Sequence, residues 1–129
     1  MNSTDLQVRF FHKYLKPIRI CAGMTQDDLA NELGITKHSL YPIERQNAKL
    51  TVERYYACRY IIDQKKDDFV NKVIRFFALD ENVSNDSKDS LAYYIVSNYN
   101  MRQSNCKHGG VEDYVEKYIE KGMNDANKC

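Results

Sequence analysis

The sequence predicts an all-α protein, and three observations lead to this fold class. Apolar residues recur at intervals of three and four along much of the 129-residue chain, which is the spacing of one helix face. Threonine and glycine stand at the starts and ends of several such segments, where they commonly cap helices. With 43% hydrophobic and 29% charged residues and only two prolines and five glycines, the composition is that of a globular chain.

The first helix is predicted over residues 6–22. Pro17 lies within this segment and indicates either a kink or the true start of the helix, and Gly23 is suited to the position just past a helix end. The apolar residues at helical spacing are Leu6, Phe10, Tyr14, Ile18 and Cys21.

Two short helices separated by a glycine turn follow. Thr25 is predicted to cap the first of them, with Asp28 in a capping-box arrangement, and Thr36 to cap the second. Gly34 supplies the turn and Ile35 fills the angle between the helices. The inward residues are Leu29, Ala30 and Leu33 in one helix and Leu40 and Ile43 in the other. This order is typical of a helix–turn–helix; a plain helical bundle with a chance Gly–Ile turn is the alternative.

A further helix is predicted to begin at Thr51, with Val52, Tyr55, Cys58 and Ile62 at core spacing. Residues 1–62 carry nine Lys/Arg against six Asp/Glu, whereas residues 63–129 carry ten against twelve. The contrast between a basic and an acidic half weakly favours a polyanionic partner for the first half.

Residues 18–62 resemble the helix-turn-helix domain of lambda-repressor-like regulators, also called the Xre or Cro type. The matching stretch is RICAGMTQDDLANELGITKHSLYPIER, residues 19–45; its Thr-Gln opening, Leu-Ala pair, Gly-Ile turn, Thr cap and Ile-Glu-Arg ending stand at the family's spacing. Gln46 stands where the family usually has glycine, and Pro42 lies inside the recognition helix. The resemblance implies a lambda-repressor-like helix-turn-helix bundle over residues 1–62, followed by a C-terminal helical extension over 63–129.

The resemblance also implies which residues act. An arginine late in the first helix pairs with the glutamate ending the recognition helix, here Arg19 and Glu44, and this pairing also suits a carboxylate near a helix C-terminus. Gln26 resembles the family's phosphate-contacting glutamine. The predicted DNA-binding residues are Thr25, Gln26, Thr36, Lys37, His38, Ser39, Tyr41, Arg45, Asn47 and Lys49.

Base reading is expected from the first turn of the recognition helix. Lys37 and His38 can donate hydrogen bonds to guanine, and Tyr41 can contact a thymine methyl group. Pro42 comes after this turn. It removes a backbone donor, crowds the carbonyl of His38 and disfavours helical angles at Tyr41, so a distorted helix is expected there.

Beyond residue 63 the sequence predicts a helix over 64–79, a polar loop over 80–89, a helix over 90–101, a break over 104–110 with a hinge at Gly109–Gly110, and an amphipathic helix over 111–122. The apolar stripe of the last helix is predicted to mediate dimerisation through Val111, Tyr114, Val115, Tyr118 and Ile119. The alternatives are that these helices extend the core, or that they hold a small-molecule, peptide or protein effector.

These observations predict a cytoplasmic, homodimeric, sequence-specific regulator of transcription, a repressor rather than an activator, which binds double-stranded DNA without a cofactor. The alternative is a helix-turn-helix-derived adaptor or antagonist that binds another regulator and no longer reads DNA. No catalytic motif stands out. The four cysteines are widely spaced, Cys106 and His108 alone are too few for a metal site, and no apolar run is long enough to cross a membrane.

Overall fold

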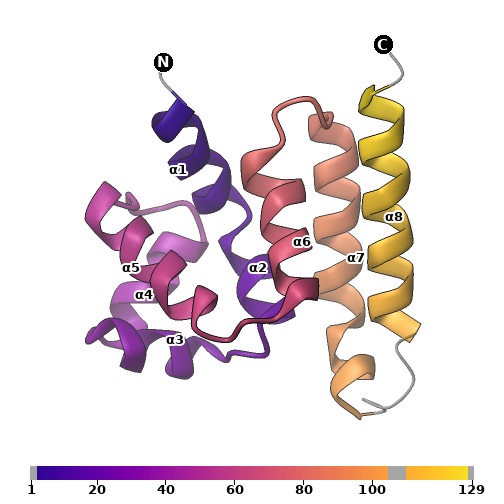
Figure 1. Ribbon diagram of the computed structural model, residues 1–129. Helices are drawn as coiled ribbons and strands as arrows, with labels where there is room; N and C mark the ends of the chain where they lie inside the picture. Colours follow the sequence, from indigo (N-terminus) through magenta and orange to yellow (C-terminus); the bar gives the residue numbers. More distant parts are fainter. Residues whose placement is uncertain (1–2, 105–109, 128–129) are drawn as a thin grey trace.

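The computed structural model describes residues 3–104 and 110–127, and every regular element in this part of the chain is helical, as the predicted fold class requires. The elements are α1 (Ser3–Lys13), α2 (Leu15–Cys21), α3 (Gln26–Leu33), α4 (Lys37–Glu44), α5 (Val52–Asp63), α6 (Asp68–Ile74), the π-helical turn η1 (Arg75–Leu79), α7 (Asn85–Ser104) and α8 (Gly110–Asn127). In Figure 1, α3–α5 lie on one side of α2, and α6–α8 stand side by side on the other. None of the described helices is long and apolar enough to span a bilayer.

The segment predicted as one helix over residues 6–22 is two helices, α1 and α2, separated at Tyr14. Pro17 explains the break, because it has no N–H to offer the carbonyl of Lys13 and its ring crowds that carbonyl. Helical hydrogen bonding resumes one residue later, where the Ile18 N–H donates to the Tyr14 carbonyl over 3.1 Å.

The helix ends predicted around α3 and α4 are confirmed. Gly23 and Gly34 both adopt left-handed backbone angles, with φ of 75° and 72°; Gly34 directly follows α3, and Gly23 follows Ala22, the C-cap residue of α2. Thr25 and Asp28 form the reciprocal capping box, and the Thr36 hydroxyl accepts from the Ser39 N–H. Local side-chain chemistry therefore sets where both helices begin and end.

The expected distortion at Pro42 is not seen, because α4 continues through Pro42 to Glu44. A proline removes only one hydrogen bond from the helix, and the packing on either side of it is tight: Leu40 and Ile43 are 1% and 3% exposed. The Arg45 N–H donates to the Tyr41 carbonyl over 3.0 Å, so helical bonding continues after the proline.

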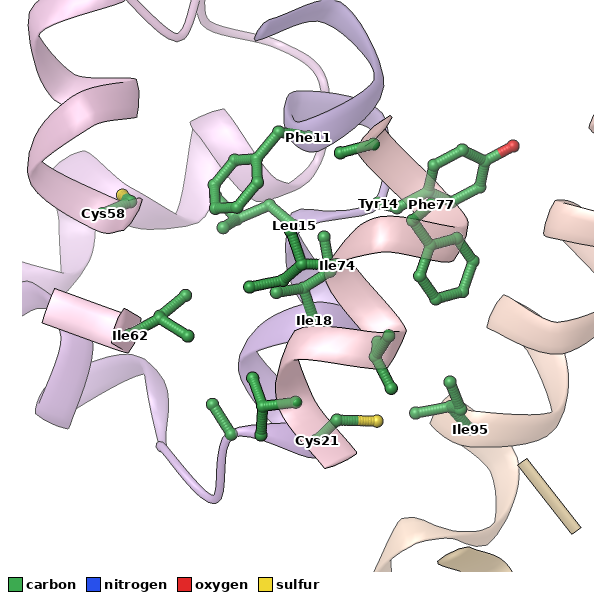
Figure 2. Close-up of a cluster of buried hydrophobic side chains, with 14 of the residues drawn as sticks. Phe11, Tyr14, Leu15, Ile18, Cys21, Cys58, Ile62, Ile74, Phe77 and Ile95 are labelled. Carbon is green, nitrogen blue, oxygen red and sulfur yellow. The ribbon is translucent and has the colours of Figure 1, made fainter. Parts of the chain in front are cut away.

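One hydrophobic cluster runs through both halves of the chain. In Figure 2, Leu15 and Ile18 of α2 lie between Ile62 of α5 and Ile74 of α6. The Tyr14 ring stacks on that of Phe77, with centroids 4.7 Å apart. The predicted boundary between residues 62 and 63 is thus crossed by a shared core.

Several side chains differ from their predicted positions. Val52, predicted in the core, is 43% exposed. The loop predicted over 80–89 is half helical, since α7 begins at Asn85, and Lys88 within it is only 1% exposed. Its amine lies 4.0 Å from the centroid of the Phe10 ring, a cation–π contact that offsets part of its burial. Residues 105–109, including Cys106, His108 and the predicted hinge residue Gly109, lie outside the described residues.

Two of the five residues in the apolar stripe of α8 are buried within the same chain, so these two do not lie on the surface where a dimer contact was predicted. Val115 and Ile119 are 0% and 2% exposed, and α8 packs on α6 and α7. Val111 and Tyr118 are half-buried, and Tyr114 is exposed while stacking on Tyr94 of α7 at 4.1 Å between centroids. Val115 and Ile119 extend the core and Val111 and Tyr118 pack against it, as the alternative interpretation holds, whereas Tyr114 does not belong to it.

Candidate nucleic-acid interface

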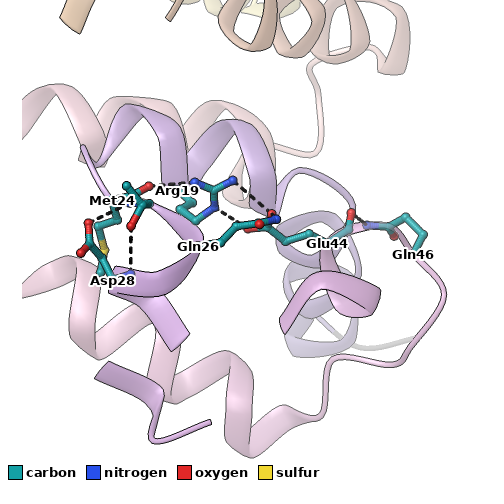
Figure 3. A network of polar contacts seen from close by, with 7 residues as sticks. Arg19, Met24, Gln26, Asp28, Glu44 and Gln46 are labelled. Atoms are coloured by element: carbon teal, nitrogen blue, oxygen red, sulfur yellow. Dashed lines mark hydrogen bonds and ion pairs between the residues drawn. The ribbon is translucent and has the colours of Figure 1, made fainter. Parts of the chain in front are cut away.

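A buried ion pair joins α2 to α4. Arg19 and Glu44 are 7% and 8% exposed, and the Arg19 Nε and Nη2 donate to the two carboxylate oxygens of Glu44. The Arg19 Nη1 also donates to the Met24 carbonyl over 2.8 Å, and the Gln26 amide donates to Glu44 over 3.0 Å. Figure 3 shows this network, which brings together the end of α2, the start of α3 and the end of α4.

The chemistry of this pair explains its position. A carboxylate near the C-terminal end of a helix is unfavourable against the helix dipole unless a cation compensates it, and Glu44 is the last residue of α4. A buried charge is tolerated when it is paired and hydrogen-bonded, and Glu44 receives three donors. The pair therefore fixes the end of α4 against α2.

The connection between α3 and α4 is equally well determined. Ala30 is 1% exposed, and its carbonyl accepts from the Ile35 N–H over 3.0 Å across the turn at Gly34. At the start of α3, the pKa of the Asp28 carboxyl lies below its usual range, because it accepts from the Thr25 backbone N–H within the capping box. The two helices thus meet in one defined geometry.

The outward face of α4 gathers polar side chains from the predicted set. Lys37, His38, Ser39, Tyr41 and Arg45 are all exposed; at about 100° per residue His38, Tyr41 and Arg45 lie opposite the buried residues of α4, and Lys37 and Ser39 flank them. The guanidinium carbon of Arg45 lies 5.3 Å from the centroid of the Tyr41 ring, and its Nη1 donates to the Tyr41 hydroxyl over 3.3 Å, so these two side chains contact each other. The Ser39 hydroxyl is 3.1 Å from that of Thr36 and belongs to the cap.

The remaining predicted residues lie in two places. Thr25 and the half-buried Gln26 stand at the start of α3, where the Gln26 amide is already bonded to Glu44. Asn47 and Lys49 are exposed in the segment between α4 and α5. Lys49 lines a separate hollow of about 490 Å³ beside Arg9 of α1, so the structure does not bring it together with Lys37.

An open hollow of about 480 Å³ adjoins the α4 face. It is lined by Lys37 and Tyr41 of α4 and by the start of α3, and also by Lys16 of α2 and Val96 of α7. Sequence reasoning missed both of these last residues. Lys16 stands one helical turn before Arg19 and could have been found from that spacing, whereas no local pattern indicates Val96.

The described residues hold no group of three or more His, Cys, Asp or Glu side chains that could bind a metal ion. Comparisons of the whole chain with protein-family models, with curated proteins and with solved structures find no match.

Proposed function

We propose that this protein is a sequence-specific DNA-binding regulator of transcription, acting as a repressor, and that α3 and α4 form a lambda-repressor-like helix-turn-helix. The observation that carries the proposal is the face of α4. Lys37, His38 and Tyr41 are exposed together on a helix whose opposite side is buried and whose end is held by an ion pair.

This arrangement suits contacts with duplex DNA. A helix of this kind enters the major groove with its N-terminal residues toward the base edges, where Lys37 and His38 donate to guanine and Tyr41 contacts a thymine methyl group. The start of α3 faces the phosphates, because its first backbone N–H groups favour an anion. Since the Gln26 side chain is bonded to Glu44, its contribution to a phosphate contact comes from the backbone or from reorganisation of that bond.

The proposal includes a homodimer, because two half-sites one helical turn apart give a longer and more specific operator than one. The stripe of α8 does not supply the contact, since Val115 and Ile119 are buried within the chain. Sedimentation of the full chain with and without operator DNA tests this part. A mass of one chain per operator would contradict it.

A protein-binding adaptor is the competing function. Two observations favour it: the small positive charge of residues 1–62, and the position of Pro42 between Tyr41 and Ile43 on α4. Such an adaptor would use the same face of α4 for another protein and would have no affinity for phosphates.

Fluorescence anisotropy against a random duplex of about 20 base pairs separates the two functions. Binding that weakens steeply between about 50 and 200 mM salt supports a DNA reader, and absence of binding at low salt supports the adaptor. Lys37→Gln should reduce the affinity, whereas Lys117→Gln, at an exposed position on α8, serves as the matched control. Selection from a random pool should then return a palindromic consensus.

A further inference from the structure

The hollow beside α4 extends onto the second half of the chain, and this placement has a consequence for DNA binding. We propose that the DNA-binding surface includes α7, with one phosphodiester backbone running through the hollow between the α4 face and Val96, and with Lys16 contacting a phosphate. This proposal rests on the proposed function and assigns it two further residues and a second structural element.

The position of α7 is fixed by its packing on α2. Leu91 and Ile95 are fully buried, and Figure 2 shows Ile95 of α7 beside Cys21 of α2. Val96 follows Ile95 by one residue, about 100° around the helix, and is 41% exposed in the wall of the hollow. Tyr93, three residues earlier, is 77% exposed. A tightly held helix thus presents an uncovered side next to α4.

The charge of the hollow suits a phosphate backbone. Its basic side chains are Lys16, Arg19 and Lys37, and its acidic one is Asp27. Arg19 is neutralised by Glu44, whereas neither lysine is among the ion pairs of the described part of the chain. Two unpaired amines that line the same open hollow, one from α2 and one from α4, can both reach a polyanion lying in it.

Continuity with the α4 face favours DNA over a small ligand. Lys37 and Tyr41 belong both to the outward face of α4 and to the wall of the hollow. A duplex that places base edges against Lys37 therefore brings its flanking phosphates past the same side chain and toward Lys16 and Val96. In this arrangement α7 restricts the angle at which the duplex approaches α4.

The test introduces a charge at the proposed contact. The Val96→Lys variant of the full chain should bind duplex DNA more tightly and make the negative slope of log K against log salt steeper by about 1, because one more phosphate is neutralised. Lys16→Gln should make the slope shallower by about the same amount, and Val96→Glu should weaken binding. Tyr114→Lys, at an exposed position on α8, is the matched control, and circular dichroism checks that each variant is folded.

The outcomes separate this inference from the function on which it rests. A wild-type chain that binds duplex DNA with a salt slope, together with a Val96→Lys variant that binds no more tightly than Tyr114→Lys, overturns the role of α7 and leaves the proposed function standing. A wild-type chain that shows no salt-dependent binding overturns both. If Val96→Lys does not fold, Val96→Glu becomes the deciding variant. A folded Val96→Glu chain that binds duplex DNA as tightly as the wild type then overturns the inference.

Discussion

Helices α3 and α4 are held by a buried ion pair and by side-chain caps at their ends, whereas α6, α7 and α8 are held by aromatic and aliphatic packing along their lengths. The Glu44 carboxylate accepts two hydrogen bonds from Arg19 and one from Gln26. On the other side of the molecule, the ring of Phe76 contacts those of Phe77 and Tyr118.

This difference determines which helix surfaces stay exposed and can contact a partner. Anchoring at the helix ends leaves the outward side of α4 uncovered, so its polar side chains remain free to contact another molecule. Packing along the length of α8 uses its apolar side within the chain, because Val115 and Ile119 are both buried. An apolar stripe in a sequence therefore does not by itself indicate an exposed interface, because other helices of the same chain can cover it.

The largest effect on stability is expected from removing one partner of the ion pair that holds α4. Glu44→Gln should lower the free energy of unfolding by about 3–5 kcal/mol, because Arg19 is left as an uncompensated buried charge. Urea denaturation measures this loss. The double variant Arg19→Met with Glu44→Met should lose much less, since replacing both partners by apolar residues of similar volume is often close to neutral. Equal losses in the two variants would show that charge pairing is not what holds α4.

The packing of α8 is tested by truncating Ile119. Ile119→Ala should cost about 2–4 kcal/mol, because it leaves a cavity at a fully buried position, while Tyr114→Ala should cost less than about 1 kcal/mol at its exposed position. Denaturation midpoints should not depend on protein concentration. A midpoint that rises with concentration, and that Ile119→Ala alone abolishes, would restore the stripe as a dimer contact.

The link between the halves is tested at Tyr14, whose hydroxyl donates to Asp89 of α7 over 2.6 Å. Tyr14→Phe should cost about 1–2 kcal/mol at neutral pH. Burial, together with the Asp89 carboxylate, raises the pKa of Tyr14 well above its usual range. Stability should therefore fall as the pH rises above about 10, where the unfolded chain releases this proton and the folded chain keeps it.

Tyr14→Phe should flatten that alkaline decline, as followed by urea midpoints at several pH values. Burial raises the pKa of Cys58 from 9.0 to about 12, which adds a decline of the same sign that begins near pH 9. Cys58→Ala is the control that removes this second contribution. An alkaline decline unchanged by Tyr14→Phe would show that the pKa of Tyr14 is not raised in the folded chain.

The smallest expected effect is at the start of α3. Thr25→Ala should lower stability by about 1 kcal/mol, because the hydroxyl that accepts from the Asp28 N–H over 3.0 Å is lost. Thr25→Ser keeps an acceptor and should be close to neutral. Thermal denaturation compares the two, and a Thr25→Ser variant as unstable as Thr25→Ala would argue against the cap.

The fold of the first half could be predicted because its signals are local. The capping residues Thr25, Gly34 and Thr36 act on backbone groups within a few residues, so their spacing reports the helix ends directly. At Pro42 the local signal gave a wrong expectation. The packing of Leu40 and Ile43 outweighs the preference of proline against the helix interior. Tertiary contacts routinely override such preferences.

Burial and surface position in the second half are harder to predict, because they depend on contacts between residues far apart in the sequence. Lys88, near the start of α7, lies in a polar stretch, yet it is only 1% exposed and its amine lies over the ring of Phe10 in α1. Val96 joins the hollow only because α7 packs on α2. Neither fact can be read from the residues around these positions, so the part of the candidate interface contributed by α7 could not be predicted.

The backbone conformation and side-chain hydrogen bond of Gln46 limit which substitutions position 46 can accept. Gln46 adopts a left-handed φ of 67°, which costs a non-glycine residue about 1 kcal/mol or more, and its side-chain amide donates to the His12 carbonyl over 2.9 Å. Glycine would relieve the backbone but would cut this tie to α1. Position 46 and α1 are therefore expected to covary among descendants of this chain, and a lineage that lost α1 would be free to adopt glycine at position 46.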